Sequence, residues 1–333
     1  MNELSLILRD LDLASARACP SVLATLVTVA GSSYRRPGAR LLVTSDGHRT
    51  GSISGGCLEE DVLVRARQVA LTGRAELLTY DTSSENDLVW GVGLGCHGVV
   101  QVLLERLPVN SAWAPVVAAN LAARLPTTLA VVWRASNPTQ LGTRLVTPTE
   151  SPGPTTEAGV FFDVIAPPPA LFIFGAGDDA QPLARLAHTL GWHLTIADPR
   201  ATFATAARFP EADAIIVASA PKLVARAQPR PDALAVVMTH HYIHDVPILG
   251  ELLSRPLAYV GLLGPRKRAD QILTDLALPP GSAARARLHA PVGLDLGAET
   301  PAEVALSILA EMCAALAHRD PRPLRERTGP IHR

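Results

Sequence analysis

The stretch Leu171-Phe-Ile-Phe-Gly-Ala-Gly-Asp-Asp-Ala180 decides the fold of the second half of this chain. A short apolar run ends in the pattern Gly175-x-Gly177-x-x-Ala180, and residues with helical spacing follow. This strand–turn–helix order is typical of a dinucleotide or phosphate fingerprint. Gly175 permits a tight turn, and Gly177 lets the backbone approach a phosphate. The start of the helix then offers unpaired N–H groups and a positive dipole end to the anion.

A second apolar run ends in Asp198, where a carboxylate can hydrogen-bond a ribose hydroxyl. From residue 170 onward, short apolar runs alternate with helical stretches. That alternation predicts a doubly wound parallel sheet of the Rossmann type. The candidate strands are 171–174, 193–197, 214–217, 235–238 and 258–261.

The first half of the chain has a mixed pattern. We expect a helix over 3–17, strands at 22–29 and 39–44, a turn at Asp46-Gly47 and a helix over 57–72. A stretch rich in Pro, Thr, Ser and Gly then separates this half from the next. The chain is therefore predicted to be an α/β protein in three parts: an N-terminal mixed α+β domain (1–150), a Pro-rich linker region (151–169) and a C-terminal Rossmann-like domain (170–333).

Composition narrows the class of protein further. The chain has 333 residues and a formal net charge of −1, which gives no reason to expect a nucleic acid or an anionic membrane as partner. No apolar run reaches the length of a membrane span, and the start lacks the basic and apolar regions of a signal peptide. The four cysteines form no Cys-x-x-Cys pair, so we expect a cytoplasmic protein with reduced thiols.

Two glycine-rich loops of the first half each contain one cysteine. They are Gly51-Ser-Ile-Ser-Gly-Gly-Cys-Leu-Glu-Glu60 and Trp90-Gly-Val-Gly-Leu-Gly-Cys-His-Gly98. Thiolates are soft metal ligands, and glycines let a bulky ligand approach the backbone. Cys57 also falls where a helix begins, a favourable place for a negative sulfur. The alternative is that these cysteines are buried and the glycines serve turns only. The candidate cofactor-binding residues here are Gly55, Gly56, Cys57 and Cys96, the two cysteines also as candidate metal contacts.

Two other loops contain basic residues. Arg35 and Arg36 lie in a Gly/Ser/Pro-rich loop and suit the capture of a phosphate or carboxylate, although a solvated loop is an equal alternative. Gly264, Arg266 and Arg268 follow the last candidate strand, at the edge where doubly wound sheets bind ligands. An anion bridging this loop and the Gly175 turn is physically reasonable; the alternative is a solvated basic helix face.

A third strand end is followed by Thr239-His-His-Tyr-Ile-His-Asp245. Histidines there can bind a metal or move protons, but the spacing matches no strong zinc signature. His240 is the better candidate because it lies nearest the strand end, whereas His241 suits an ordinary loop or capping role.

Several stretches together resemble the XdhC/CoxI family of xanthine dehydrogenase accessory factors, and they follow the family's order along nearly the whole chain. They are Gly31-Ser-Ser-Tyr-Arg-Arg-Pro-Gly-Ala-Arg40, Gly51-Ser-Ile-Ser-Gly-Gly-Cys-Leu-Glu59, Gly93-Leu-Gly-Cys-His-Gly98, Phe174-Gly-Ala-Gly-Asp-Asp-Ala180, Ala197-Asp-Pro-Arg200, Met238-Thr-His240, Gly261-Leu-Leu-Gly-Pro-Arg266, the stretch 291–305 and Gly329-Pro-Ile-His332.

The resemblance implies a protein that binds molybdenum cofactor (molybdopterin, in its mono- or dinucleotide form). In such a protein, Cys57 and Cys96 would be the candidate molybdenum contacts. Its implied partners are a cysteine desulfurase, with which it supports sulfuration, and an apo molybdenum hydroxylase that receives the cofactor; a homodimer is also implied. Two positions depart from the family pattern. Asp178 stands where relatives often have histidine, which disfavours a phosphate there, and His97 replaces a glycine of the second cysteine loop.

Two other classes of function remain open from the sequence. An NAD(P)-dependent oxidoreductase would use the Gly175 fold with Cys57 or His240 in catalysis. A scaffold would bind only a target enzyme, and its Rossmann half would hold no nucleotide. The leading hypothesis is a non-enzymatic cofactor carrier, because the resemblance extends over both halves.

Overall fold

The computed structural model describes residues 3–81, 98–146, 159–279, 281–329 and 331. The chain forms two compact units, whose main segments are Asn2–Pro167 and Pro168–Arg327. The division falls in the run of three prolines that starts at Pro167, where a helix or central strand is excluded. Each unit is described separately below. Within the described residues, no helix has both the length and the apolar character needed to cross a membrane.

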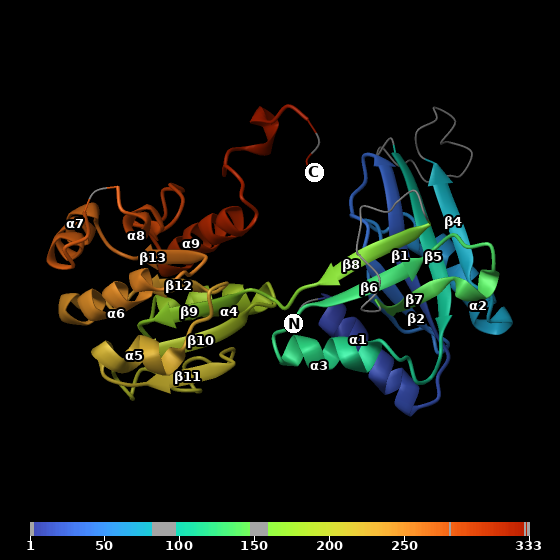
Figure 1. Ribbon diagram of the computed structural model, residues 1–333, viewed down its shortest axis with the longest axis horizontal. Coiled ribbons are helices and arrows are strands. Elements are labelled where there is room, and N and C mark those ends of the chain that lie inside the picture. The colour runs from blue at the N-terminus through green and yellow to red at the C-terminus, as the bar shows by residue number, and fades with distance from the viewer. Residues whose placement is uncertain (1–2, 82–97, 147–158, 280, 330, 332–333) are drawn as a thin grey trace. The chain divides into compact units, whose positions relative to one another are not determined.

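The N-terminal unit is built on a five-stranded antiparallel sheet in the order β3-β2-β1-β5-β4 (Figure 1). The expected turn at Asp46-Gly47 joins β2 to β3. The long strands β1 and β5 pair along almost their whole length and form the centre of the sheet. The strands are β1 (Ser21–Gly31), β2 (Arg40–Thr44), β3 (Arg49–Gly51), β4 (Glu76–Asp81) and β5 (Gly98–Leu107).

Helices cover both faces of this sheet, because successive strand residues point to opposite sides. On β1, Val22, Ala24 and Leu26 pack with helix α2 (Glu59–Thr72). The intervening Leu23 faces the other side and packs with α1 (Glu3–Ala16) and α3 (Ala114–Ala122). This two-sided burial explains why β1 reads as a continuous apolar run rather than an alternating one.

A small antiparallel sheet in the order β7-β6-β8 completes this unit. Its strands are β6 (Thr127–Val132), β7 (Gly142–Leu145) and β8 (Val160–Ile165), with a short 3-10 helix at Pro138–Gln140. Leu129 of β6 and Ile165 of β8 pack into the core that contains α1 and α3.

The second unit is a six-stranded parallel sheet in the order β11-β10-β9-β12-β13-β14. Numbered within the unit, this is the Rossmann order 3-2-1-4-5-6, so the predicted doubly wound α/β fold is confirmed. The sixth strand, at Leu288–His289, is not among the five candidate strands, because two residues are too few to leave a pattern in the sequence. The strands are β9 (Ala170–Phe174), β10 (His193–Asp198), β11 (Ala214–Val217), β12 (Leu234–Val237), β13 (Tyr259–Leu262) and β14 (Leu288–His289).

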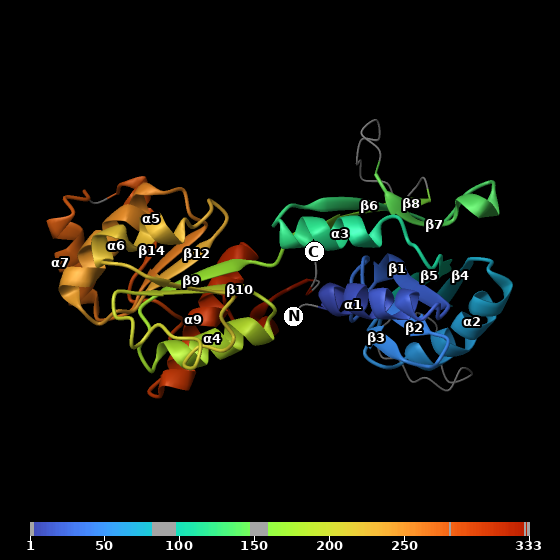
Figure 2. The same ribbon diagram turned by 90° about the horizontal axis from the view of Figure 1, so that it is seen from below.

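Helices cover both faces of this sheet too. Figure 2 shows α4 and α9 on one side and α5 and α6 on the other. Alternate residues of β9 point to opposite faces of the sheet. Leu171 and Ile173 pack towards α4 and α9, whereas Phe172 and Phe174 pack towards α5, α6 and α7. The helices are α4 (Ala180–Thr189), α5 (Ala220–Ala227), α6 (Tyr242–Ser254), α7 (Arg266–Asp275), α8 (Ala283–Ala286) and α9 (Pro301–Leu316), followed by a short 3-10 helix at Leu324–Glu326.

Candidate functional site

The Gly175 turn lies where the strand order of the parallel sheet reverses, between β9 and β12. Gly175 has φ +126°, and a Cβ there would lie 2.4 Å from the carbonyl oxygen of Met238. Only glycine therefore fits this close approach of the two strand ends. Ligands of doubly wound sheets bind beyond the carboxyl ends of the strands at this reversal.

Asp198, at the end of β10, is fully buried and accepts four hydrogen bonds. The donors are the backbone N–H of Ala176 (2.7 Å) and, from Arg200, its backbone N–H (2.7 Å), Nε (2.9 Å) and Nη2 (2.8 Å). Burial alone would raise the pKa of Asp198, but the hydrogen bonds from Arg200 and Ala176 outweigh burial and hold it below its usual value. The carboxylate thus fastens the glycine turn to β10, and a ribose hydroxyl would have to displace one of these donors.

Two further carboxylates flank the turn. Asp178 is exposed and forms an ion pair with Arg208 (2.8 Å), whose Nη2 also donates to the carbonyl oxygen of Ala176 (3.2 Å). Asp179, just before α4, lies 2.6 Å from His240 Nε2. The sequence marks Asp178 but not Arg208. Nothing in the residues around Arg208 indicates that it pairs with a turn thirty residues away.

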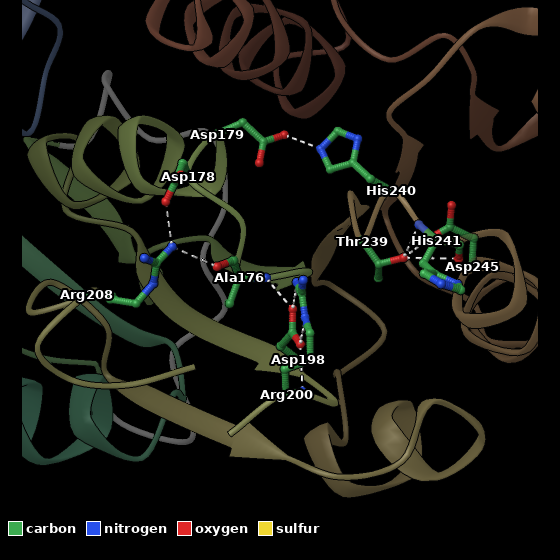
Figure 3. Close-up of polar contacts among 10 residues, drawn as sticks. All are labelled: Ala176, Asp178, Asp179, Asp198, Arg200, Arg208, Thr239, His240, His241 and Asp245. Atoms are coloured by element: carbon green, nitrogen blue, oxygen red, sulfur yellow. Dashed lines mark hydrogen bonds and ion pairs between the residues drawn. The ribbon is translucent and has the colours of Figure 1, made fainter. Parts of the chain in front are cut away.

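His240 lies directly beyond β12 in a left-handed conformation, with φ +57°. Its hydrogen bond with Asp179 links the loop after β12 to the start of α4 (Figure 3). The structure therefore brings Gly175, Gly177 and His240 together at one edge of the sheet.

The third loop of this edge contains an ion pair within the unit. Arg268 forms an ion pair with Asp245, which is buried in the first turn of α6 and also accepts from Thr239 Oγ1 (2.5 Å). Arg266 is exposed at the start of α7, and Gly264 has φ +134°. Arg268 is thus engaged within the unit, whereas Arg266 faces solvent.

In the N-terminal unit, Cys57 is exposed on the loop that enters α2. Glu59 holds this loop: its carboxylate accepts from the backbone N–H groups of Ile53 (3.2 Å) and Ser54 (2.8 Å) and from the hydroxyls of Ser52 (3.0 Å) and Ser54. Burial alone would raise the pKa of Glu59, but these hydrogen bonds, led by those of Ser54, lower it. The sequence alone assigns Glu59 no role, because nothing in its spacing marks it as the acceptor that holds this loop.

The glycines next to Cys57 differ in how open their surroundings are. A Cβ at Gly56 would meet no heavy atom within 4 Å among the described residues, and Gly56 has φ +110°. Gly55 lies next to Tyr34, whose ring would be 3.8 Å from a Cβ at Gly55. A bulky ligand can therefore approach the backbone beside Cys57.

Replacing Glu59 by glutamine is expected to destabilise the protein by about 2 kcal/mol, because an amide nitrogen would then face donors that need an acceptor. The loop around Cys57 should also become looser, so the thiol should react faster with an exposed-thiol reagent. Thermal unfolding and the labelling rate measure these effects. Glu60→Gln is the matched control, since Glu60 is exposed in the same turn; equal behaviour of both variants would contradict the role of Glu59.

The remaining sequence-predicted residues lie in two places. Arg35 forms an ion pair with Glu3, and Arg36 is exposed; both line a pocket described below. Cys96 lies outside the described residues, so its position relative to Cys57 stays a prediction. Among the described residues, no cluster of three or more His, Cys, Asp or Glu side chains is arranged to hold a metal ion.

This geometry defines a Rossmann-type unit joined to an antiparallel unit that presents an exposed cysteine. Comparison with known proteins then identifies the family. Residues 171–312 match the XdhC Rossmann domain, and residues 14–81 match the XdhC and CoxI family. The chain belongs to this family, as its sequence motifs indicate.

Relatives match over nearly the whole chain. The chain is 36% identical, over 88% of its length and 92% of the relative, to a Bacillus subtilis protein named as a probable subunit of xanthine dehydrogenase. It is 27% identical, over 90% of its length and 85% of the relative, to the Escherichia coli molybdenum cofactor insertion chaperone PaoD. A solved Bacillus halodurans structure described as a xanthine dehydrogenase is 32% identical with a TM-score of 0.81, covering 98% of this chain and 99% of that one.

Proposed function

We propose that this protein binds molybdenum cofactor, supports its sulfuration with a cysteine desulfurase, and inserts it into an apo molybdenum hydroxylase of the xanthine dehydrogenase type. It would act as a carrier rather than as an enzyme, in the cytoplasm and as a homodimer. The proposal is supported by the likeness of both units to a protein named as a molybdenum cofactor insertion chaperone.

The observation that carries the proposal is the exposed Cys57 on its Glu59-held loop. A thiolate sulfur is a soft ligand that suits molybdenum or a transferable sulfur atom. The open space beside Gly56 suits a bulky cargo. Cys96, Arg35 and Arg36 remain proposed contacts in this unit, and Gly175, Gly177, Asp198, His240, Gly264, Arg266 and Arg268 remain proposed contacts in the other.

Titration of the purified protein with molybdenum cofactor tests the proposal, with NAD(P)H titrated separately. We expect Cys57→Ala to weaken cofactor binding about tenfold or more, equivalent to about 1.4 kcal/mol, because the sulfur ligand is lost. Cys313→Ala is the matched control, since Cys313 is also exposed but lies on α9. Cys96→Ala tests the second loop in the same assay.

Two outcomes would contradict the carrier. Tight nicotinamide binding without molybdenum cofactor binding would favour the NAD(P)-dependent oxidoreductase instead. Recovery of hydroxylase activity that is unchanged by Cys57→Ala and by Gly177→Ala would favour a scaffold that binds only the target enzyme.

A further inference from the structure

We propose that a pocket of the N-terminal unit binds a phosphate monoester, with Arg40 as its buried anchor. The pocket has a volume of about 340 Å³ and lies between α1 and the loop that leads into β2. This volume is within the range of small-molecule sites. We call it the Arg40 pocket; the side chains that matter for binding are Glu3, Tyr34, Arg35, Arg36 and Arg40.

Arg40 carries unused hydrogen-bonding capacity. It is only 4% exposed. Its Nη1 donates to the carbonyl oxygen of Gly38 (3.1 Å) and lies 2.7 Å from Asp163 Oδ2. Its Nε and Nη2, however, have no hydrogen-bond partner among the described residues. Buried polar groups almost always have partners, so these two N–H groups indicate a missing acceptor.

The unused atoms of Arg40 have the geometry that an oxyanion needs. Nε and Nη2 lie on one edge of the planar guanidinium, and this edge binds two oxygens of a phosphate or carboxylate in parallel. The opposite side of the group is already fixed by Asp163 and Gly38. Arg40 is therefore oriented before any ligand arrives, which lowers the entropy cost of binding.

Arginines outnumber carboxylates among the residues that line the pocket, although Asp163 already lies against Arg40. Arg35 and Arg36 also line the pocket, and Glu3 is its one acidic lining residue. Glu3 is paired with Arg35, while Arg36 is exposed and forms no ion pair within the described ranges. We infer that Glu3 pairs with Arg35 in the absence of ligand, and that a bound phosphate takes the place of the Glu3 carboxylate.

The rim of the pocket suits a flat ring next to the phosphate. Tyr34 is 67% exposed, and its ring packs beside Gly55 of the Cys57 loop. A ligand in the pocket would thus lie next to Tyr34, the lining residue whose ring adjoins the Cys57 loop at Gly55. Resting on the proposed function, we assign this pocket to the phosphate end of molybdenum cofactor, with its heterocyclic ring on the Tyr34 side.

Calorimetric titration of the full-length protein with inorganic phosphate, phenyl phosphate and benzoate tests the pocket. We expect phenyl phosphate to bind more tightly than the other two probes, because it combines the dianion with a ring. Arg36→Gln should weaken its binding about tenfold, since a charge-assisted hydrogen bond is lost. Glu3→Gln should strengthen it about threefold, since a competing carboxylate is removed.

Arg40→Lys tests the anchor itself, because lysine keeps the charge but loses the two-atom edge. We expect at least about tenfold weaker binding, with thermal unfolding measured alongside to show that the variant is folded. Arg67→Gln on the exposed side of α2 is the matched charge control and should change binding less than about twofold. No phenyl phosphate binding by the wild type, or equal effects of Arg36→Gln and Arg67→Gln, would overturn the pocket.

Competition separates this inference from the proposed function. Displacement of phenyl phosphate by molybdenum cofactor supports both. Phenyl phosphate binding with the expected variant pattern, but no displacement, keeps the anion pocket and overturns its assignment to the cofactor. Cofactor binding that is unaffected by Arg36→Gln and by Arg40→Lys overturns the assignment of the pocket to the cofactor and leaves the carrier function standing.

Discussion

Gly175→Ala is expected to lower the free energy of unfolding of the Rossmann-type unit by about 3 kcal/mol or more. Two costs add in this variant: a non-glycine residue at φ +126° is strained, and its Cβ would lie 2.4 Å from Met238 O and 2.8 Å from Thr239 N. Both contacts are backbone atoms of the neighbouring strand end, so neither can move aside by a change of rotamer. The β9 and β12 ends would have to separate.

Hydrogen exchange of peptides from β9 and β10 is the suitable measurement, because it reports on this unit alone in a chain of two units. Gly297→Ala is the matched control: Gly297 also has a positive φ of +65°, but a Cβ there would meet nothing within 4 Å among the described residues. Its expected cost is about 1 kcal/mol. Equal protection in the two variants would show that the close approach at Gly175 costs nothing.

Asp198→Ala is expected to cost about 3 kcal/mol, the second largest effect. The buried N–H of Ala176 would lose its acceptor, and Arg200 would lose a two-atom ion pair. The glycine turn would then no longer be fastened to β10. The control is Asp232→Ala, an exposed residue whose contact with Arg230 is 3.6 Å, and its expected effect is within about 0.5 kcal/mol.

The pH dependence gives an independent test of the same residue. The pKa of Asp198 is lower in the folded than in the unfolded protein, so the unfolded state binds more protons at acid pH. The contribution of Asp198 to the free energy of unfolding is therefore complete above the ordinary aspartate pKa of about 3.9. It is lost as the pH falls from there through the lowered pKa of the folded protein. The stability gap between the wild type and Asp198→Ala should shrink below about pH 4. A gap that stays constant down to about pH 3 would contradict this assignment.

Much of the fold could be predicted from the sequence because its signals are local. The Gly-x-Gly turn and the alternation of apolar runs with helical stretches predict the doubly wound sheet, and Thr300, Pro301 and Glu303 predict the start of α9, where the capping box forms. The strand β14 has two residues and leaves no periodic pattern, so only pairing with β13 reveals it.

The candidate site was only partly predictable, because the roles of charged residues depend on which side chains meet. Asp198 looks like a ribose ligand in the sequence, yet Arg200 and the Ala176 N–H occupy its oxygens. From the sequence, Arg40 only falls in the strand predicted at 39–44, and Glu59 only in the helix predicted over 57–72. Neither the unpartnered edge of Arg40 nor the loop held by Glu59 has a signature in residue spacing.

The sequence by itself determined the family, the division into a mixed α+β part and a Rossmann-like part, and the glycine, cysteine and arginine motifs. These depend on backbone freedom and on apolar periodicity, both of which act over a few neighbouring residues. Only the tertiary structure decided which charges are already paired and which remain available. Folding brings together residues that are distant in the chain, such as Arg40 and Asp163. Whether a buried charge meets such a partner determines the free-energy cost of burying it.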